Sequence, residues 1–285
     1  MKQLAILACA LALTGSAWAS DHGPVFGYAT PVNSQGEFSF DSGLFGRNGT
    51  RGTQFSTGSQ IGYGLTPQLT FTAFIPATFG SGSLPETRSF PGGEWSGGAS
   101  WRFLHSVTQV GKRSEATGSL ALVLPGPQPD SGILSSLNRA PGIAGTVAAG
   151  LASRSQYLWV GGGYTGFFHR SGSRRPDTTT WSTVYGFRPA RLRRGYNQWD
   201  YRGLIEFTGE HTGDVRVHDT VVPDSRSTSL WLGPSILAIF KNVAIEGGVQ
   251  GPLYRNISTS VYGRETIRFA LNISYLKFSS RTTAH

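Results

Sequence analysis

The sequence predicts an all-β fold: a transmembrane antiparallel up-and-down β-barrel of about twelve strands that follows an N-terminal signal peptide. Three observations lead to this prediction. The chain opens with an export signal, its remainder divides into alternating runs long enough to cross a membrane, and the last run closes on an aromatic residue, Phe278. We therefore divide the chain into a signal peptide (residues 1–19), a barrel (20–278) and a short tail (279–285).

Residues 1–19 contain the three parts of a cleaved secretory signal. Lys2 supplies the positive start, residues 4–13 are apolar, and Ala17-Trp18-Ala19 forms a small-residue cleavage site. Cleavage after Ala19 removes the only cysteine, Cys9, together with the only methionine. The mature protein is then expected to have no disulfide, no thiolate nucleophile and no cysteine metal site.

Composition favours a chain whose outer surface faces lipid. Charged residues make up 14% of the sequence, against roughly 25% in an average soluble domain, while aromatic residues reach 12%. No stretch after the signal approaches the roughly 18 consecutive apolar residues of a membrane helix. The formal net charge is +9, or +8 without Lys2. An exported chain of this charge is expected to meet outer-membrane lipid, lipopolysaccharide phosphates and anionic solutes, and no nucleic acid.

The chain after the signal reads as short alternating runs separated by turn residues, without a helical period. Most runs have ten to fourteen residues, enough for a tilted transmembrane strand. An even number of strands places both ends of the barrel on the same side of the membrane. The expected strands are residues 36–45, 54–64, 68–79, 95–105, 115–124, 142–152, 156–169, 178–188, 198–210, 228–240, 243–254 and 265–278.

Each of the clearest runs has one apolar and one polar face, because successive strand residues point to opposite sides. In the run 198–210, Ile205 and Phe207 share one face, and Asp200 and Glu206 share the other. A secreted β-sandwich would bury the apolar face, whereas a membrane barrel turns it to lipid, and periodicity alone does not separate the two. The residues expected to line the lumen of a barrel are Arg102, Arg188, Asp200, Arg202, Glu206, Glu246, Gln250 and Arg268.

The strand count, the export signal and aromatic residues at strand ends favour the barrel over the sandwich. Aromatic side chains mark the two membrane interfaces of such barrels. The aromatic residues assigned to strand ends are Phe79, Trp95, Trp181, Trp199, Trp231, Phe240, Tyr254 and Phe278.

Connection lengths alternate as they do in bacterial barrels, with short turns on the periplasmic side and long loops outside. The short turns are 65–67, 153–155 and 241–242, and the long loops are 80–94, 125–141, 170–177 and 211–227. Two expected periplasmic connections, 106–114 and 189–197, are longer than this pattern requires. The second carries a basic cluster, Arg188 to Arg194, which is read either as a solvated turn or as a site for an anionic partner.

Several short motifs, in order from about residue 62 to 278, resemble one family of Gram-negative proteins. Tyr63-Gly64-Leu65-Thr66-Pro67-Gln68-Leu69-Thr70 is similar to its "YGLTDRLTL" hairpin, and Ser100-Trp101-Arg102-Phe103-Leu104 to its "KYRFL" strand. The segments 186–189 and 204–210 are together similar to "RP…LELNGE", and the segments 232–235 and 246–254 to "SPGL" and "EAGVQLPVY". The family is named after the MetA pathway of phenol degradation. The resemblance implies an outer-membrane barrel that transports hydrophobic or aromatic compounds. The tail 279–285 departs from it, because such barrels end at the terminal aromatic residue.

Catalytic chemistry has one candidate in the sequence. His169 and Ser171 lie two residues apart at the expected outer end of a strand, as in outer-membrane phospholipases and lipid A deacylases, where His activates Ser. Those motifs continue with Asn, whereas this chain has Gly172, and no residue is identified to orient His169. A polar strand end is the simpler interpretation. The six histidines show no metal-ligand spacing, so neither metal nor cofactor is expected.

The sequence therefore predicts a non-enzymatic outer-membrane channel or transporter for small solutes, with hydrophobic or aromatic compounds as the class that the resemblance implies. Its expected partners are membrane lipid and lipopolysaccharide, the barrel-assembly machinery and the solute itself. Two alternatives stay open: an acyl hydrolase that uses His169 and Ser171, and a structural barrel that transports nothing.

Overall fold

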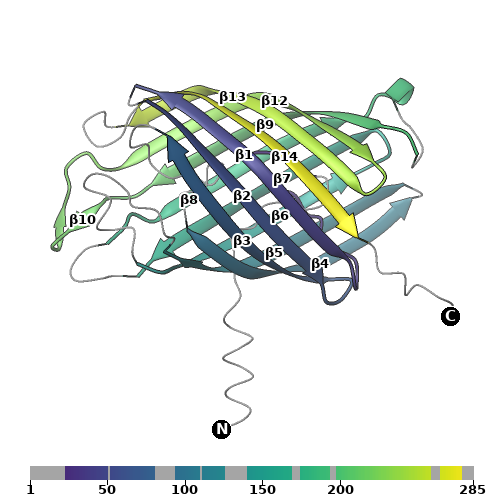
Figure 1. Cartoon of the computed structure of the whole chain (residues 1–285), viewed down its shortest axis with the longest axis horizontal. Coiled ribbons are helices and arrows are strands. Elements are labelled where there is room, and N and C mark those ends of the chain that lie inside the picture. The colour runs from purple at the N-terminus through teal and green to yellow at the C-terminus, as the bar shows by residue number, and fades with distance from the viewer. Residues whose placement is uncertain are drawn as a thin grey trace, which may run out of the picture.

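The computed structural model describes residues 23–50, 52–80, 94–109, 111–125, 140–168, 174–192, 197–257 and 264–277. Its main feature is a closed barrel of antiparallel strands (Figure 1). The barrel strands are β1 (Phe38–Gly49), β2 (Gly52–Gly64), β3 (Leu69–Gly80), β4 (Trp95–Gln109), β5 (Lys112–Leu124), β6 (Gly142–Ala152), β7 (Gln156–Phe167), β8 (Thr178–Phe187), β9 (Asp200–Thr212), β12 (Ser227–Phe240), β13 (Val243–Ile257) and β14 (Glu265–Lys277).

The barrel closes between its first and last strands. Strand β1 pairs with β2 on one side and with β14 on the other, from Phe38 opposite Lys277 to Gly49 opposite Glu265 (Figure 1). The predicted fold class, a closed barrel of twelve antiparallel strands, is therefore confirmed. Each of the twelve predicted strands corresponds to one barrel strand, with boundaries that differ by up to four residues.

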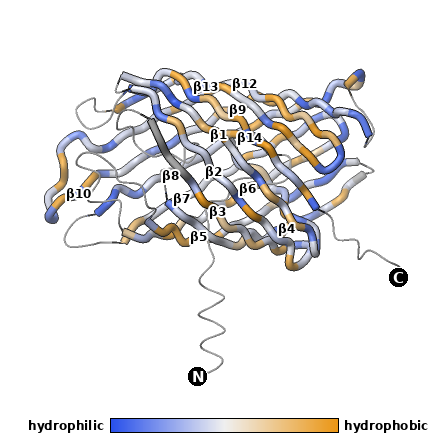
Figure 2. The backbone as a smooth tube through the Cα atoms, viewed as in Figure 1, coloured by the Kyte–Doolittle hydropathy of each residue, from blue (hydrophilic) through white to orange (hydrophobic). Residues whose placement is uncertain are grey.

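The two faces of the wall differ as the alternation predicted. On β9, Ile205 is 50% exposed and points outward, whereas its neighbour Glu206 is fully buried. Strand β14 alternates in the same way, with Leu271 and Ile273 exposed and Asn272 and Ser274 buried. Hydrophobic residues are interspersed with hydrophilic ones along the strands instead of gathering in one stretch (Figure 2). The outer surface is thus apolar and the interior largely polar, as a lipid environment requires.

One end of the barrel carries tight turns, and we call it the short-turn end. Its connections are residues 65–68, 110–111, 153–155, 188–199 and 241–242. The hydroxyl of Thr66 accepts hydrogen bonds from the amides of Gln68 and Leu69, and that of Ser153 does the same for Ser155 and Gln156. Such hydrogen bonds from backbone amides to a nearby hydroxyl stabilise short turns.

The prediction of a long connection at 106–114 is wrong. Strand β4 continues to Gln109 and β5 begins at Lys112, so only two residues separate them. Gly111 has a φ of 78°, a conformation that suits glycine and permits this tight reversal. The connection 188–199 does stay long, and it contains a 3₁₀ turn, η1 (Ala190–Leu192). Part of the basic cluster there, residues 193–196, lies outside the described residues.

One further feature, a small hairpin, was not predicted, and one aromatic residue was assigned wrongly. The connection between β9 and β12 contains a small hairpin, β10 (Arg216–Val217) and β11 (Thr220–Val221), whose tip residues His218 and Asp219 both have positive φ. The assignment of Trp231 to an aromatic strand end is wrong, because its side chain is fully buried inside the barrel.

In the described part of the chain, no helix has the length and apolar character needed to cross a membrane.

Candidate functional site: the barrel lumen

The chain before β1 folds back into the barrel. Residues 24–37, called the inner segment below, contact inward-facing side chains of β3, β5, β8 and β9. Phe26 and Tyr28 are buried, as are Thr30 and Asn33. The segment thus crosses the lumen and fills much of its middle.

Glu206 holds the start of the inner segment. Its two carboxylate oxygens accept hydrogen bonds from the backbone N–H groups of Val25 at 3.0 Å, Phe26 at 2.8 Å and Gly27 at 2.7 Å. The hydroxyl of Ser235 on β12 donates to the same carboxylate. A carboxylate buried this completely is costly unless several donors surround it. The inner segment supplies three of these donors, so Glu206 and the segment depend on each other.

The next residues bind two other walls. The amide of Tyr28 donates to the Ser182 hydroxyl on β8 at 2.8 Å, and its phenol pairs with the Thr180 hydroxyl on the same strand. Thr30 donates from its hydroxyl to Glu115 on β5 at 3.2 Å, and its carbonyl accepts from Thr117 at 2.6 Å. These bonds join the segment to two separate strands of the barrel wall, with β6 and β7 between them.

The last part of the segment returns to the wall beside β1. The Asn33 amide donates to Thr70 of β3 at 2.8 Å, and its side chain donates to Ser39 of β1 at 2.9 Å. Gly36 then donates to the carbonyl of Gly64 at the end of β2. Most bonds to the segment are therefore made by individual side chains of the wall, and none of the described residues 24–37 belongs to a barrel strand.

Close packing accompanies these bonds. Phe26 packs against Phe45 of β1 and Ala270 of β14. On β7, a Cβ added to Gly161 would lie 2.5 Å from the Cβ of Tyr28, closer than side chains tolerate. Glycine at this wall position lets the segment approach the strand directly. The fit between wall and segment is thus steric as well as polar.

Three of the predicted lumen residues lie in this middle region. Glu206 binds the inner segment, and Gln250 on β13 accepts a bond from Thr208 at 3.1 Å while donating to the Glu206 carbonyl at 3.2 Å. Glu246, also on β13, is buried and lies in register with Asn272 of β14.

Arg268 lies toward the other end of the barrel, in a buried ion network. Its guanidinium contacts Glu210 at 2.6 Å and Glu265, and it stacks over the Trp231 ring at 3.9 Å. Glu265 in turn contacts Arg47 at 3.1 Å. Breaking a buried ion pair of this kind by removing one partner is strongly destabilising.

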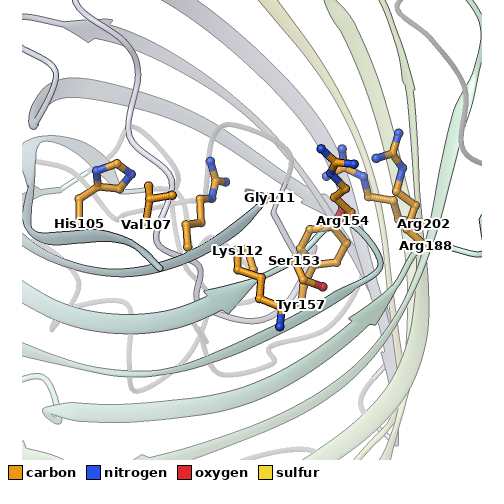
Figure 3. A pocket seen from close by; sticks show the side chains of 11 residues that line it. His105, Val107, Gly111, Lys112, Ser153, Arg154, Tyr157, Arg188 and Arg202 are labelled. Atoms are coloured by element: carbon orange, nitrogen blue, oxygen red, sulfur yellow. The ribbon is translucent and has the colours of Figure 1, made fainter. Parts of the chain in front are cut away.

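The remaining four predicted residues lie at the short-turn end. Arg188 and Arg202 both contact Asp200, at 2.6 Å and 3.3 Å. Arg102 contacts Glu115 at 3.1 Å and donates to the Pro67 carbonyl. Arg188 and Arg202 also line a cavity of about 420 Å³ at this end (Figure 3).

The hydrolase candidates His169 and Ser171 lie outside the described residues, as do residues 1–19 and the tail 279–285. In the described ranges, no group of three or more His, Cys, Asp or Glu side chains is placed to hold a metal ion.

Sequence reasoning missed the inner segment and the acid Glu115. Residues 24–35 were assigned to no strand, although Phe26, Tyr28 and Val32 are unusually apolar for a tail in front of the first strand. That apolar spacing is the one signal that this stretch has a buried place in the fold. Glu115 was taken as the first residue of a strand, with no role in the lumen.

Comparison with known proteins supports the fold. No family model and no curated protein matches this sequence. Among solved structures, the COG4313 outer membrane channel from Pseudomonas putida F1 superposes with a TM-score of 0.64 at 13% identity, covering 92% of this chain and 100% of that one. The NanC porin follows with a TM-score of 0.49 at 6% identity, covering 84% and 100%. LpxR from Salmonella typhimurium gives 0.47 at 9% identity, covering 83% and 99%. At these identities the likeness concerns the fold, and the chain shares the architecture of outer-membrane barrels.

Proposed function

We propose that this chain is an outer-membrane channel for small solutes in a Gram-negative bacterium, and that the inner segment closes its lumen in the conformation described here. The observation that carries the proposal is the way the segment is held. Side chains of the wall bind residues 25–28, Thr30 and Asn33, and residues 24–35 form no part of the continuous strand ladder. Such a segment can leave the lumen while the barrel stays closed, because the wall keeps its own backbone hydrogen bonds.

We also propose how the chain is exported and how the barrel is oriented in the membrane. Residues 1–19 act as a cleaved signal, and the short-turn end faces the periplasm, since bacterial barrels place their short turns there. The exposed apolar residues of the outer face, such as Ile205 and Leu271, then meet membrane lipid and lipopolysaccharide. The barrel-assembly machinery inserts the chain, and the internal position of Phe278 does not prevent this.

For the solute, hydrophobic or aromatic compounds are the class to test first. The motifs shared with the phenol-degradation family support this choice. The lumen also contains an apolar strip on β7, β8, β9 and β12, formed by residues that include Trp159, Val184 and Leu237. A path lined by both apolar and charged side chains suits amphipathic molecules better than sugars.

The proposed role is non-enzymatic. A hydrolase would need Ser171 within hydrogen-bond reach of His169 and a third group that orients the imidazole. We expect purified protein to release no fatty acid from phospholipid or lipid A, with or without calcium. Release that disappears in a Ser171→Ala variant would overturn the transport proposal.

The channel is tested with purified protein in liposomes. Swelling with small solutes should be slow for the wild type and clearly faster for Glu206→Gln, since the substituted amide adds a donor where three N–H groups need acceptors. Glu246→Gln is the matched control, because Glu246 is buried on a nearby strand and accepts no hydrogen bond from the described inner segment.

Two results would contradict the proposal. Recovery of the protein from cells as a soluble periplasmic monomer would exclude the membrane barrel. Equal swelling for Glu206→Gln and Glu246→Gln, both well folded, would show that the hold of Glu206 on the inner segment does not limit passage.

A further inference from the structure

The cavity at the short-turn end is lined mainly by basic side chains. It is formed by β4, β5, the turn between β6 and β7, and the facing ends of β8 and β9 (Figure 3). Its volume of about 420 Å³ lies in the range of small-molecule sites. The lining residues with charge are Lys112, Arg113, Arg154, Arg188 and Arg202, and His105 lies beside them.

Acidic residues offset only part of this charge. Asp200 contacts Arg188 and Arg202, and Glu115 contacts Arg113 at 3.5 Å. Glu115 is buried, with 3% of its side chain exposed, whereas 49% of the Arg113 side chain is exposed to the cavity and solvent. Glu115 also contacts Arg102, so one carboxylate serves two guanidinium groups.

Lys112 and Arg154 differ from the other cations of the cavity. Within the described ranges, neither has an acidic or other hydrogen-bonding partner. The two residues come from neighbouring turns, and the Arg154 side chain lies against Gly111, where an added Cβ would be 2.8 Å from its Cγ and Nε atoms. The contact with Gly111 positions the guanidinium without neutralising it.

Cations that share a concave site without enough counter-charges repel one another and concentrate anions there. The cavity also has apolar lining from Val107, Ala152 and the ring of Tyr157, which stacks on Trp159 with the ring centroids 5.4 Å apart. A ligand that satisfies both parts needs an anionic head and a small apolar body.

We propose that this cavity binds small organic carboxylates, such as an aromatic monocarboxylate, through Lys112 and Arg154. The inference rests on the proposed channel function, for which it names a solute class and a binding position at the periplasmic mouth. The carboxylate accepts hydrogen bonds from the Lys112 ammonium and the Arg154 guanidinium, a geometry in which arginine is especially effective. The apolar body then lies toward Val107 and Tyr157.

The test is calorimetric titration of detergent-purified full-length protein at low ionic strength. The probes are benzoate, benzyl alcohol as a neutral molecule of similar shape, and inorganic phosphate as an anion without an apolar body. Benzoate should bind, with an affinity that falls as salt is added, because the site is partly exposed. Benzyl alcohol should not bind measurably, and phosphate should bind at least tenfold more weakly than benzoate.

Two variants assign the binding to the cavity. A Lys112→Met/Arg154→Met double variant should lose at least tenfold in benzoate affinity. Lys241→Met is the matched control, since Lys241 lies in another turn at the same end and does not line the cavity. Heat-modifiable migration in SDS gels shows that each variant still forms the barrel.

Each remaining outcome overturns the proposal. Absence of benzoate binding, or equal binding by the double variant, excludes the site. Benzyl alcohol binding as tightly as benzoate means an apolar site, and equally tight phosphate means an anion site without preference for organic carboxylates. Because the titration requires no passage of solute, a failure here leaves the liposome result for the channel intact.

Discussion

The middle of the lumen and its short-turn end handle charge in opposite ways. In the middle, the Glu206 carboxylate is fully buried and four donors surround it, three of them from the inner segment. At the short-turn end, Lys112 and Arg154 line a cavity, and neither has an acidic partner among the described residues. Strands β5 and β9 contribute residues to both regions. On the proposed function, this difference keeps the middle closed and leaves the short-turn end open to an anionic solute.

The largest effect is expected where the closed region depends on one group. In Glu206→Gln, the loss of charge-assisted bonds to three backbone amides should weaken the local hold by about 3 kcal/mol. Hydrogen exchange at Val25, Phe26 and Gly27 should then become roughly a hundredfold faster. Lys112→Met should leave these amides unchanged. If the amides of Val25, Phe26 and Gly27 exchange at the same rate in both variants, Glu206 does not hold the inner segment as described.

Alternate residues of β13 are assigned to the lipid face and to the lumen face, and two substitutions test this assignment. Ile245→Arg places a charge on the outer face of β13 and should cost about 2–4 kcal/mol of stability in a bilayer. Glu246→Arg, on the opposite face, should cost less because the new charge would lie away from lipid and near the acidic groups of Asp41 and Glu206. Folding yields in lipid vesicles measure the order, and equal or reversed costs would show that the faces are assigned wrongly.

A smaller effect is expected from the steric fit of the inner segment. Gly161→Ala brings a methyl group to 2.5 Å from the Tyr28 Cβ and should displace the segment at a cost of about 1–3 kcal/mol. Gly251→Ala is the control, because no heavy atom lies within 4 Å of an added Cβ there. Protease cleavage within residues 24–37 should increase only in the first variant.

The smallest effect on stability is expected at the basic cavity. Lys112→Met and Arg154→Met remove exposed charges and should change the free energy of unfolding by less than about 0.5 kcal/mol. The same changes should shift the ion selectivity of an open variant such as Glu206→Gln away from anions. The reversal potential under a salt gradient measures this shift, and an unchanged potential would show that the cavity does not lie on the conduction path.

The sequence was sufficient for the strands and their faces because alternation is a local property. Ile205 and Glu206 already differ in their chemistry, and a barrel wall has only two sides. Turn chemistry at Thr66 and Ser153 is local as well, so those reversals were correctly placed. The reversal at Gly111 was missed because β4 and β5 continue through polar residues that read as a loop.

The site was less accessible to sequence reasoning because its contacts are distant along the chain. Val25 and Glu206 are 181 residues apart, and no local pattern connects them. The alternation predicted the inward position of Glu206, but it did not predict the backbone N–H groups that donate hydrogen bonds to its carboxylate. Trp231 shows the same limit, since only the fold reveals that Arg268 covers its ring and makes it a buried residue.

The most direct test of the account is a disulfide lock between the inner segment and the wall. The only cysteine, Cys9, lies in the predicted signal, so Tyr28→Cys/Gly161→Cys would carry a single pair in the mature protein. The ideal Cβ of Gly161 lies 2.5 Å from the Cβ of Tyr28, and an adjustment of about 1 Å reaches the separation that a disulfide needs. Liposome swelling is then compared before and after reduction. The pair is placed in the Glu206→Gln background, where the bonds from Glu206 no longer hold the segment. We expect no solute entry in the oxidised form and rapid entry after reduction. Equal entry in both forms, with the disulfide verified by gel mobility, would contradict the claim that residues 24–37 close the channel.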